Sequence, residues 1–419
     1  MDAAAENKPI EPKKRHYLTN CLYVVGFLDL FGVSIIIPLL SRHATSLGAS
    51  PSLVGLIGSV YGGLQFVSGP IVGKLSDVIG RRRILLWCLV FSAVGYAIRG
   101  LSTNLIILVI SRVISGIFKH SSSTAKAYLA EITPKAERPK VFGRFNAISS
   151  VGFIIGPVCG GYLAEDISGI CKVAFITTSL FLINAAMVYF CLEEHDPGQL
   201  KHSASVDSFT ADRFSFNYSE FVSSFRKIIR VGGDIFAVRF VMGFALLIYH
   251  SNFSLFLEKK FDSSPKMTGW IISFSTLMGV LASFLVGKVA SMYSSLPGLL
   301  FHACILQTLT LVAMTFAPSV SLFLVGISCI SVSNSVLRVC ITDMSILRCK
   351  GEDTGALLGM SQSVMSMARM VSPFIAGVAL EVSVSGPGVV ASCCGIVGSI
   401  LVPLLVMKNE NIPTKKKEN

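Results

Sequence analysis

The chain has 419 residues, of which 52% are hydrophobic and only 14% are charged. Soluble globular domains carry about 25% charged residues, so this composition excludes an ordinary soluble domain and indicates an integral membrane protein. The net charge of +12 does not indicate a nucleic-acid partner, because the Lys and Arg residues are spread between apolar runs and form no continuous basic patch.

Apolar runs long enough to cross about 30 Å of hydrocarbon as helices follow one another along the chain. The first six predicted spans cover 18–40, 51–72, 84–102, 105–126, 141–163 and 173–191. The last six cover 233–257, 267–288, 298–316, 320–343, 355–379 and 387–407. The sequence therefore predicts an all-α membrane protein with twelve transmembrane helices in two pseudo-symmetric six-helix bundles, 18–191 and 232–407, with polar segments at 1–17, 192–231 and 408–419.

Most basic residues outside the spans fall on one side of the predicted bilayer. They lie in both tails, in the central segment and in every second loop, whereas the opposite side carries few, Arg42 and Arg99 among them. By the positive-inside rule, we expect both termini in the cytosol. The prediction is a monomeric, multi-pass protein in contact with lipid, in either the plasma membrane or an endomembrane.

The two halves of the chain repeat each other. The segment GFIIGPVCGGYLAE at 152–165 matches ARMVSPFIAGVALE at 368–381, which pairs Pro157 with Pro373 and Gly161 with Gly377. This match indicates a six-plus-six duplication, the arrangement in which a central cavity opens alternately to each side of the membrane.

The segment GKLSDVIGRRR at 73–83 joins the second and third predicted spans. Gly73 and Gly80 permit a tight turn, Asp77 can meet a helix N-terminus, and Arg81 and Arg82 can meet carboxylates or lipid phosphates. We predict that these residues form a latch between the halves. The simpler alternative is positive-inside anchoring, which explains the arginines but neither Asp77 nor the glycines.

Four further charged residues near the inner ends of spans are candidate gate or latch groups: Glu131, Arg138, Arg338 and Asp343. For Arg338 the alternative is a side chain that reaches the membrane interface. For Glu131 and Arg138 the alternative is a solvated run of charges.

Asp29 in the first span and Arg112 in the fourth are ionisable groups at membrane depth. A charged side chain there costs at least about 2.5 to 3.5 kcal/mol on insertion scales, so it normally faces a cavity or a partner. Asp29 lies about 16 Å, and Arg112 about 12 Å, from the outer end of its predicted span. We predict that they pair, with Asp29 exchanging a proton and Arg112 tuning its acidity. A fixed structural ion pair is the alternative.

Other polar residues inside the spans are candidate cavity or substrate contacts. They are Gln65, Lys119, His120, Asn146, His250, Gln307, Asn334, Gln362 and Arg369. Lys119 and His120 continue the fourth span inward in a polar run, which favours a water-lined or substrate-lined position. Each of the others has an interhelical hydrogen bond as its alternative role.

The fifth span holds a cluster of small residues around a proline: Gly152, Gly156, Pro157, Gly160 and Gly161. Small residues let backbones approach closely, and proline frees a carbonyl and bends the helix. We predict a hinge there, with ordinary small-residue helix packing as the alternative.

The loop at 73–83, the Arg112 motif RVISGIF, the glycine pattern of the fifth span and the duplication together resemble the major facilitator superfamily, and within it the drug:proton antiporter branch. The resemblance implies secondary active transport of a small organic solute by alternating access, in antiport with protons. A uniporter, and a receptor or scaffold that keeps the fold without transporting, are the alternatives. The sequence holds no P-loop, metal-ligand spacing or nucleophile–base pair, so we expect neither an enzyme nor a cofactor.

Overall fold

The computed structural model describes residues 12–134, 136–165, 169–193, 218–348 and 354–408. Every regular element among them is helical, which confirms the predicted all-α fold. The chain forms two compact units. Unit 1 comprises Met1–Leu47, Gly63–Thr210 and Ser264–Ser273, and unit 2 comprises Gly48–Gly62, Ala211–Ser263 and Phe274–Asn419.

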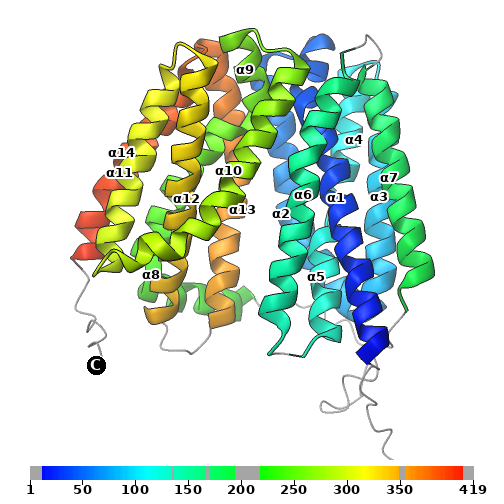
Figure 1. Ribbon diagram of the computed structural model, residues 1–419, viewed down its shortest axis with the longest axis horizontal. Coiled ribbons are helices and arrows are strands. Elements are labelled where there is room, and N and C mark those ends of the chain that lie inside the picture. The colour runs from blue at the N-terminus through cyan, green and yellow to red at the C-terminus, as the bar shows by residue number, and fades with distance from the viewer. Residues whose placement is uncertain (1–11, 135, 166–168, 194–217, 349–353, 409–419) are drawn as a thin grey trace, which may run out of the picture. The chain divides into compact units, whose positions relative to one another are not determined.

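Unit 1 holds the first set of helices. Its helices are α1 (Pro12–Ser46), most of α2 (Pro51–Ile79), α3 (Arg81–Gly100), α4 (Leu105–Phe118), α5 (Ser121–Ile132), α6 (Arg138–Leu163) and α7 (Gly169–Cys191). Helix α1 packs on α5, α6 and α7, and α3 packs on α4, α5 and α7 (Figure 1). Asn104 begins α4 as an N-cap, because its side-chain oxygen accepts the backbone N–H of Ile107 at 3.0 Å.

Unit 2 holds the second set of helices. They are α8 (Tyr218–Ser251), α9 (Phe253–Phe261), α10 (Pro265–Ser291), α11 (Leu296–Thr315), α12 (Val320–Arg348), α13 (Thr354–Val382), α14 (Gly386–Leu401) and the π-helical turn η2 (Val402–Met407). Helix α8 packs on α13 and α14, and α11 packs on α12 and α14. The beginning of α10, up to Ser273, belongs to unit 1 and the beginning of α2, up to Gly62, belongs to unit 2.

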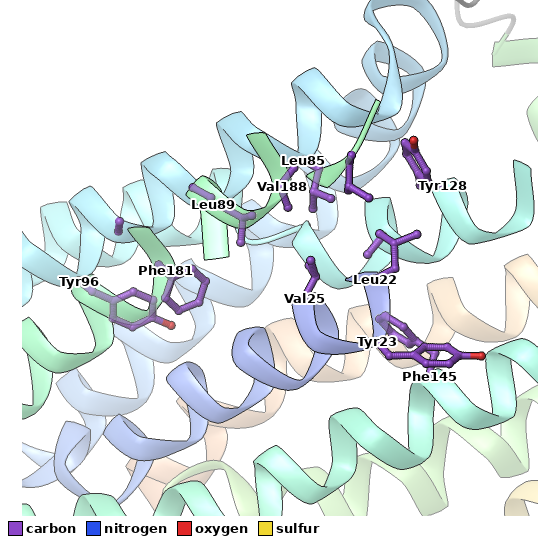
Figure 2. Packing of buried hydrophobic residues seen from close by; sticks show 14 of the residues in the cluster. Leu22, Tyr23, Val25, Leu85, Leu89, Tyr96, Tyr128, Phe145, Phe181 and Val188 are labelled. Atoms are coloured by element: carbon purple, nitrogen blue, oxygen red, sulfur yellow. The ribbon is translucent and has the colours of Figure 1, made fainter. Parts of the chain in front are cut away.

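The apolar core of unit 1 joins α1 to α3 and α7. Leu22 of α1, Leu85 and Leu89 of α3 and Val188 of α7 are fully buried in one cluster. Figure 2 shows their side chains together, and it also shows the rings of Tyr96 and Phe181, which stack with centroids 5.1 Å apart. Since lipid is as apolar as these side chains, their packing stabilises unit 1 mainly through close contact.

The described residues include twelve helical segments long and apolar enough to cross a membrane, which confirms the predicted number of spans. Large apolar side chains also point outward: Phe190 is 81% exposed and Phe284 is 80% exposed. Such residues are expected where a helix faces lipid.

Two predicted spans differ from the structure in detail. The fourth, predicted as 105–126, consists of α4 and α5 with a break between them. The seventh, predicted as 233–257, ends as a helix at Ser251, and α9 follows after Asn252. Hydropathy detects neither break, because both lie within stretches that are apolar on average.

Candidate functional site

The fourth span is interrupted at Lys119 and His120, halfway along its length. The backbone N–H of His120 donates to the carbonyl of Phe118 at 2.8 Å, and Lys119 between them has φ −78° and ψ 61°. These values are those of an inverse γ-turn, which redirects the chain before α5 begins at Ser121. The turn leaves backbone carbonyls without helical partners inside the membrane, where unpaired polar groups are costly.

Side chains of α2 satisfy the carbonyls that the break frees. Gln65 donates to the carbonyl of Lys119 at 3.1 Å, and Ser68 donates to that of Gly116 at 3.4 Å. The Ser68 hydroxyl also lies 2.8 Å from Nε2 of His120. Three of the polar residues predicted as cavity candidates, Gln65, Lys119 and His120, therefore meet at one place.

The break brings Lys119 to Asp29. Its ammonium nitrogen lies 2.5 Å from Oδ1 of Asp29, and the hydroxyl of Ser121 donates to the same oxygen at 2.5 Å. The Asp29 side chain is 1% exposed and that of Lys119 is 8% exposed. The ammonium also lies 4.9 Å from the ring centroid of Phe181. Asp29 thus has a buried counter-charge, Lys119, on the fourth span.

Lys119 supplies this charge, whereas the residue predicted to pair with Asp29 is Arg112, seven residues earlier in the fourth span. The pairing of Arg112 stays a prediction. Helix α1 continues to Ser46, so Asp29 lies 46 − 29 = 17 residues from its end, about 26 Å. Arg112 lies 7 residues into α4, about 11 Å, whereas Lys119 lies 14 residues from the same start, about 21 Å. Lys119 therefore matches the depth of Asp29 better.

Both members of the pair are removed from water. Breaking such a pair by deleting one partner typically costs about 3 to 5 kcal/mol, because it leaves an isolated charge. The second carboxylate oxygen of Asp29, Oδ2, is buried and accepts no hydrogen bond from the described residues. This oxygen offers an unused acceptor position beside the Lys119 ammonium.

Two other buried cations were missed by sequence reasoning. Arg99 was assigned to the outer side, yet it is 1% exposed, with its guanidinium 4.8 Å from the ring centroid of Tyr96. Arg239 of α8 is 9% exposed and donates to the carbonyl of Ser361 at 3.4 Å. The sequence does contain a sign of each. Arg99 lies three residues after Tyr96 on the same predicted helix, and Arg239 lies within the predicted span 233–257.

In unit 2 the predicted cavity candidates are dispersed. Gln307 is buried and donates to the carbonyl of Met242 at 3.0 Å, which is an interhelical hydrogen bond, and Arg369 donates to the hydroxyl of Ser366 at 3.3 Å. His250 is half-buried, and its ring centroid lies 5.2 Å from that of Phe253. Asn334 is half-buried, whereas Gln362, like Asn146 of unit 1, is exposed.

The segment 73–83, predicted as a loop, is helical except at Gly80, because α2 continues to Ile79 and α3 begins at Arg81. It forms a charge cluster within unit 1. Arg81 pairs with Asp77, donates to the hydroxyl of Ser76 at 2.5 Å, and lies 3.7 Å from Glu131 of α5. These contacts tie α2, α3 and α5 together at one end of the unit. Gly80 has φ 109°, a left-handed conformation that glycine adopts readily.

The remaining residues predicted for the latch lie close to the charge cluster around Arg81 or belong to unit 2. Arg82 donates to the carbonyl of Tyr189 at 2.6 Å, and Arg138 donates to that of Thr133 at 3.2 Å. A Cβ at Gly73 would meet nothing within 4 Å, so close packing does not explain this glycine. Arg338 and Asp343 are exposed on α12.

The glycines of α6 lie against the backbone of α1. A Cβ at Gly152 would lie 2.6 Å from the carbonyl oxygen of Phe27, one at Gly156 would lie 1.9 Å from Oγ of Ser34, and one at Gly160 would lie 1.8 Å from the carbonyl oxygen of Ile35. These glycines are required for close packing. The hinge role assigned to them stays a prediction.

The repeat of Pro157 and Gly161 by Pro373 and Gly377 has a structural counterpart. Within unit 1, a Cβ at Gly161 would lie 2.6 Å from the carbonyl oxygen of Pro265, the first residue of α10, and a Cβ at Gly269 would lie 2.2 Å from that of Pro157.

Within unit 2 the same pattern recurs. A Cβ at Gly377 would lie 2.3 Å from the carbonyl oxygen of Pro51, and one at Gly55 would lie 2.2 Å from that of Pro373. The duplicated sequence thus produces the same backbone contact twice.

Within the described residues, no group of three or more His, Cys, Asp or Glu side chains is placed to hold a metal ion. The ionisable groups that converge, Asp29 and Lys119, are suited to binding protons or polar groups of a solute.

Comparisons with known proteins agree with this architecture. The chain is 28% identical over 376 residues to Multidrug resistance protein 2 of Bacillus subtilis, covering 89% of this chain and 91% of the relative. It is 24% identical over 398 residues to the quinolone resistance protein NorA of Staphylococcus aureus, covering 94% and 98%.

Solved structures share the fold. The human organic anion transporter MFSD10 superposes with a TM-score of 0.61 at 18% identity, covering 94% of this chain and 100% of the other. The nucleoside transporter NupG superposes with a TM-score of 0.73 at 12% identity, covering 92% and 99%. The family model described as Major Facilitator Superfamily matches residues 22–343 and 235–419. The chain therefore belongs to the Major Facilitator Superfamily and is a membrane transporter.

Proposed function

We propose that this transporter exchanges a small organic solute for protons by alternating access, and that Asp29 takes up the proton. The observation that carries the proposal is the buried pair of Asp29 and Lys119 at the break between α4 and α5. Interrupted membrane helices with ionisable side chains are typical of transport sites. Similarity to a multidrug resistance protein and a quinolone resistance protein supports a small organic solute.

The pair provides a physical basis for exchange. Either the ammonium of Lys119 or a proton on Oδ2 can neutralise the Asp29 carboxylate. Protonation removes the attraction between the two side chains and releases the lysine, whose flexible stem carries a compact charge. A solute that binds the ionised carboxylate competes with the proton for the same group. Competition for one group is the thermodynamic requirement of antiport.

We also infer that the protein is a monomer with both termini in the cytosol, and that residues 18–191 and 232–407 are its two repeated halves. The distribution of Lys and Arg supports the orientation. The matched glycine and proline contacts support the duplication.

Reconstitution tests the coupling. Purified protein in liposomes with an internal pH-sensitive dye is exposed to norfloxacin or ethidium, with and without an imposed pH gradient. We expect solute flux to move protons in the opposite direction, and Asp29→Asn to abolish that proton movement. The exposed residue Glu165 provides the control, because Glu165→Gln removes a similar charge outside the pair. Flux through Asp29→Asn that keeps its full dependence on the pH gradient would contradict the proposal.

A uniporter is the second candidate, and a specific observation favours it. Lys119 and Ser121 both bind the same oxygen of Asp29, as a permanent structural pair would. In that case, solute flux in the same liposomes would occur without proton movement in the wild-type protein. The direction and presence of proton flux therefore separate the two functions.

A further inference from the structure

A cavity of about 360 Å³ opens in unit 1 where α1 and α6 begin. Its walls come from the first three turns of α1, from the first two turns of α6, and from Thr133 at the end of α5. The volume lies in the range of small-molecule sites. The cavity lies apart from Asp29 and Lys119, neither of which lines it.

The cavity is strongly basic. Arg15, Lys140 and Arg144 line it with three permanent positive charges, and Glu137 contributes a single carboxylate. Glu137 lies 3.5 Å from Arg15, so it offsets only one of them. His16 is a fourth basic side chain in the wall. A cavity with this excess of cations favours an anionic ligand.

Backbone dipoles add to the positive field. Glu137, the N-cap of α6, lines the cavity, so the N-terminus of α6 lies in its wall. The Glu137 side chain makes no capping hydrogen bond to α6. The N–H groups of Glu137 and Arg138 donate to the carbonyl of Pro134 and residue 139 is proline, so α6 contributes the positive end of its dipole rather than a set of free N–H groups.

Thr133 supplies an independent sign of a ligand. It is 3% exposed, it lines the cavity, and its hydroxyl has no hydrogen-bond partner among the described residues. Its backbone carbonyl accepts Nε of Arg138 at 3.2 Å, which fixes the residue in place. Buried hydroxyls are normally paired, so an unpaired one in the wall of a cationic cavity is suited to donate to an anionic oxygen.

The cavity extends along α1 as far as the apolar core of unit 1. Along α1 its wall runs from Pro12 to Tyr23, which is 23 − 12 = 11 residues or about 16 Å of helix. Arg15 and Lys140 lie near the starts of α1 and α6, while Tyr23, 8% exposed, lies further along α1, close enough to Arg144 to interact with its charge, and belongs to the apolar core with Phe145 (Figure 2). Basic pockets between membrane helices near the cytosolic surface are suited to phosphorylated headgroups.

We propose that this cavity binds a phosphate-bearing anionic group of the phosphoinositide type, presented by the leaflet at which α1 begins. That leaflet is cytosolic in the orientation proposed above. The inference does not depend on proton coupling at Asp29, because none of the cavity residues belongs to that pair.

Binding to the purified, full-length protein in detergent tests the proposal. The probes are dioctanoyl phosphatidylinositol bisphosphate, free inositol trisphosphate and inorganic phosphate, and the readouts are the apparent Kd and the unfolding temperature. We expect the lipid to bind and to raise the unfolding temperature. Binding of the lipid alone identifies a membrane source, whereas equal binding of inositol trisphosphate identifies a soluble phosphate ligand at the same site.

Two variants and a charge-matched control locate the site. K140Q/R144Q removes two exposed cations of the cavity and is expected to weaken binding about tenfold or more, since hydrogen bonds to charged groups are lost. T133V removes the unpaired hydroxyl while keeping the shape, and is expected to weaken binding several-fold without lowering the stability of the unliganded protein. K13Q/K288Q removes two exposed cations outside the cavity and should bind as the wild type does.

Three outcomes would overturn the proposal. One is that no probe binds. Another is that K13Q/K288Q loses as much affinity as K140Q/R144Q, which would indicate attraction by overall charge. The third is that T133V binds as tightly as the wild type, which would place the anion outside the cavity.

Discussion

The ammonium of Lys119 lies 2.5 Å from a carboxylate oxygen of Asp29, a residue 90 positions earlier in the chain. This contact links α1 to the point where the fourth span changes direction. The contact depends on the turn at Lys119, because this residue lies between α4 and α5 and the turn sets the direction of its side chain. The same turn depends on hydrogen bonds from α2. One arrangement thus joins three membrane spans through polar groups.

Removing one charge of this pair is expected to destabilise the protein more than removing both. Asp29→Asn leaves the Lys119 ammonium buried and unpaired, and Lys119→Met leaves the Asp29 carboxylate in the same state. Each single variant is expected to lower the free energy of unfolding by about 3 to 5 kcal/mol. The double variant should recover part of this loss, because no isolated charge remains. Thermal unfolding of the purified proteins measures the effect.

A surface ion pair provides the control for these single and double variants. Lys14 and Glu193 lie 2.5 Å apart, but their side chains are 45% and 56% exposed. Lys14→Met and Glu193→Gln should each change stability by less than about 1 kcal/mol. Equal losses at both pairs would mean that Asp29 and Lys119 are not buried as described.

The side chains of α2 that support the break are expected to matter for stability. Gln65→Leu leaves the carbonyl of Lys119 without its donor, which costs about 1 to 3 kcal/mol for a buried group. Gln362→Leu, at an exposed glutamine of α13, should change stability by less than about 0.5 kcal/mol. Similar unfolding temperatures for Gln65→Leu and the wild type would show that the carbonyl finds another partner.

The glycines of α6 that face α1, Gly152, Gly156 and Gly160, are expected to tolerate no side chain. Gly160→Ala places a Cβ where the carbonyl oxygen of Ile35 lies, so α1 and α6 must separate and folded protein should be lost. Gly143→Ala, in the same helix, meets nothing within 4 Å and should be neutral or stabilising by up to about 1 kcal/mol. The yield of monodisperse protein in gel filtration measures both. A normal yield for Gly160→Ala would contradict the close packing of the two helices.

Gly73 and Gly80 are expected to differ, because Gly73 lies within α2 and Gly80 lies between α2 and α3. Gly80→Ala forces a Cβ onto a residue with φ 109° and should cost about 1 to 3 kcal/mol. Gly73→Ala meets no neighbour and should leave stability unchanged. The two variants are compared by thermal unfolding and by solute flux in liposomes. Reduced flux in stable Gly73→Ala protein would support a role in gating, whereas unchanged flux would remove Gly73 from the latch.

Much of the site was visible in the sequence as single residues. Asp29, Lys119, His120 and Gln65 stand out because polar side chains are rare in membrane spans and are retained for function or pairing. Their mutual contacts were not visible. Arg112 was assigned as the partner of Asp29 because the first span was expected to end at residue 40, whereas α1 continues through polar residues to Ser46 and sets Asp29 deeper.

The sequence by itself determined the class of protein, the number of spans and the duplication, since hydropathy and repeated glycine and proline positions are local properties of the chain. Only the tertiary structure decided which polar groups meet. The turn at Lys119 is held by Gln65 and Ser68 of another helix, and the buried guanidinium of Arg99 donates to Ser115 of α4. Such contacts depend on the depth and rotation of whole helices, which arise from long-range hydrogen bonds and side-chain packing and are not encoded in any single segment.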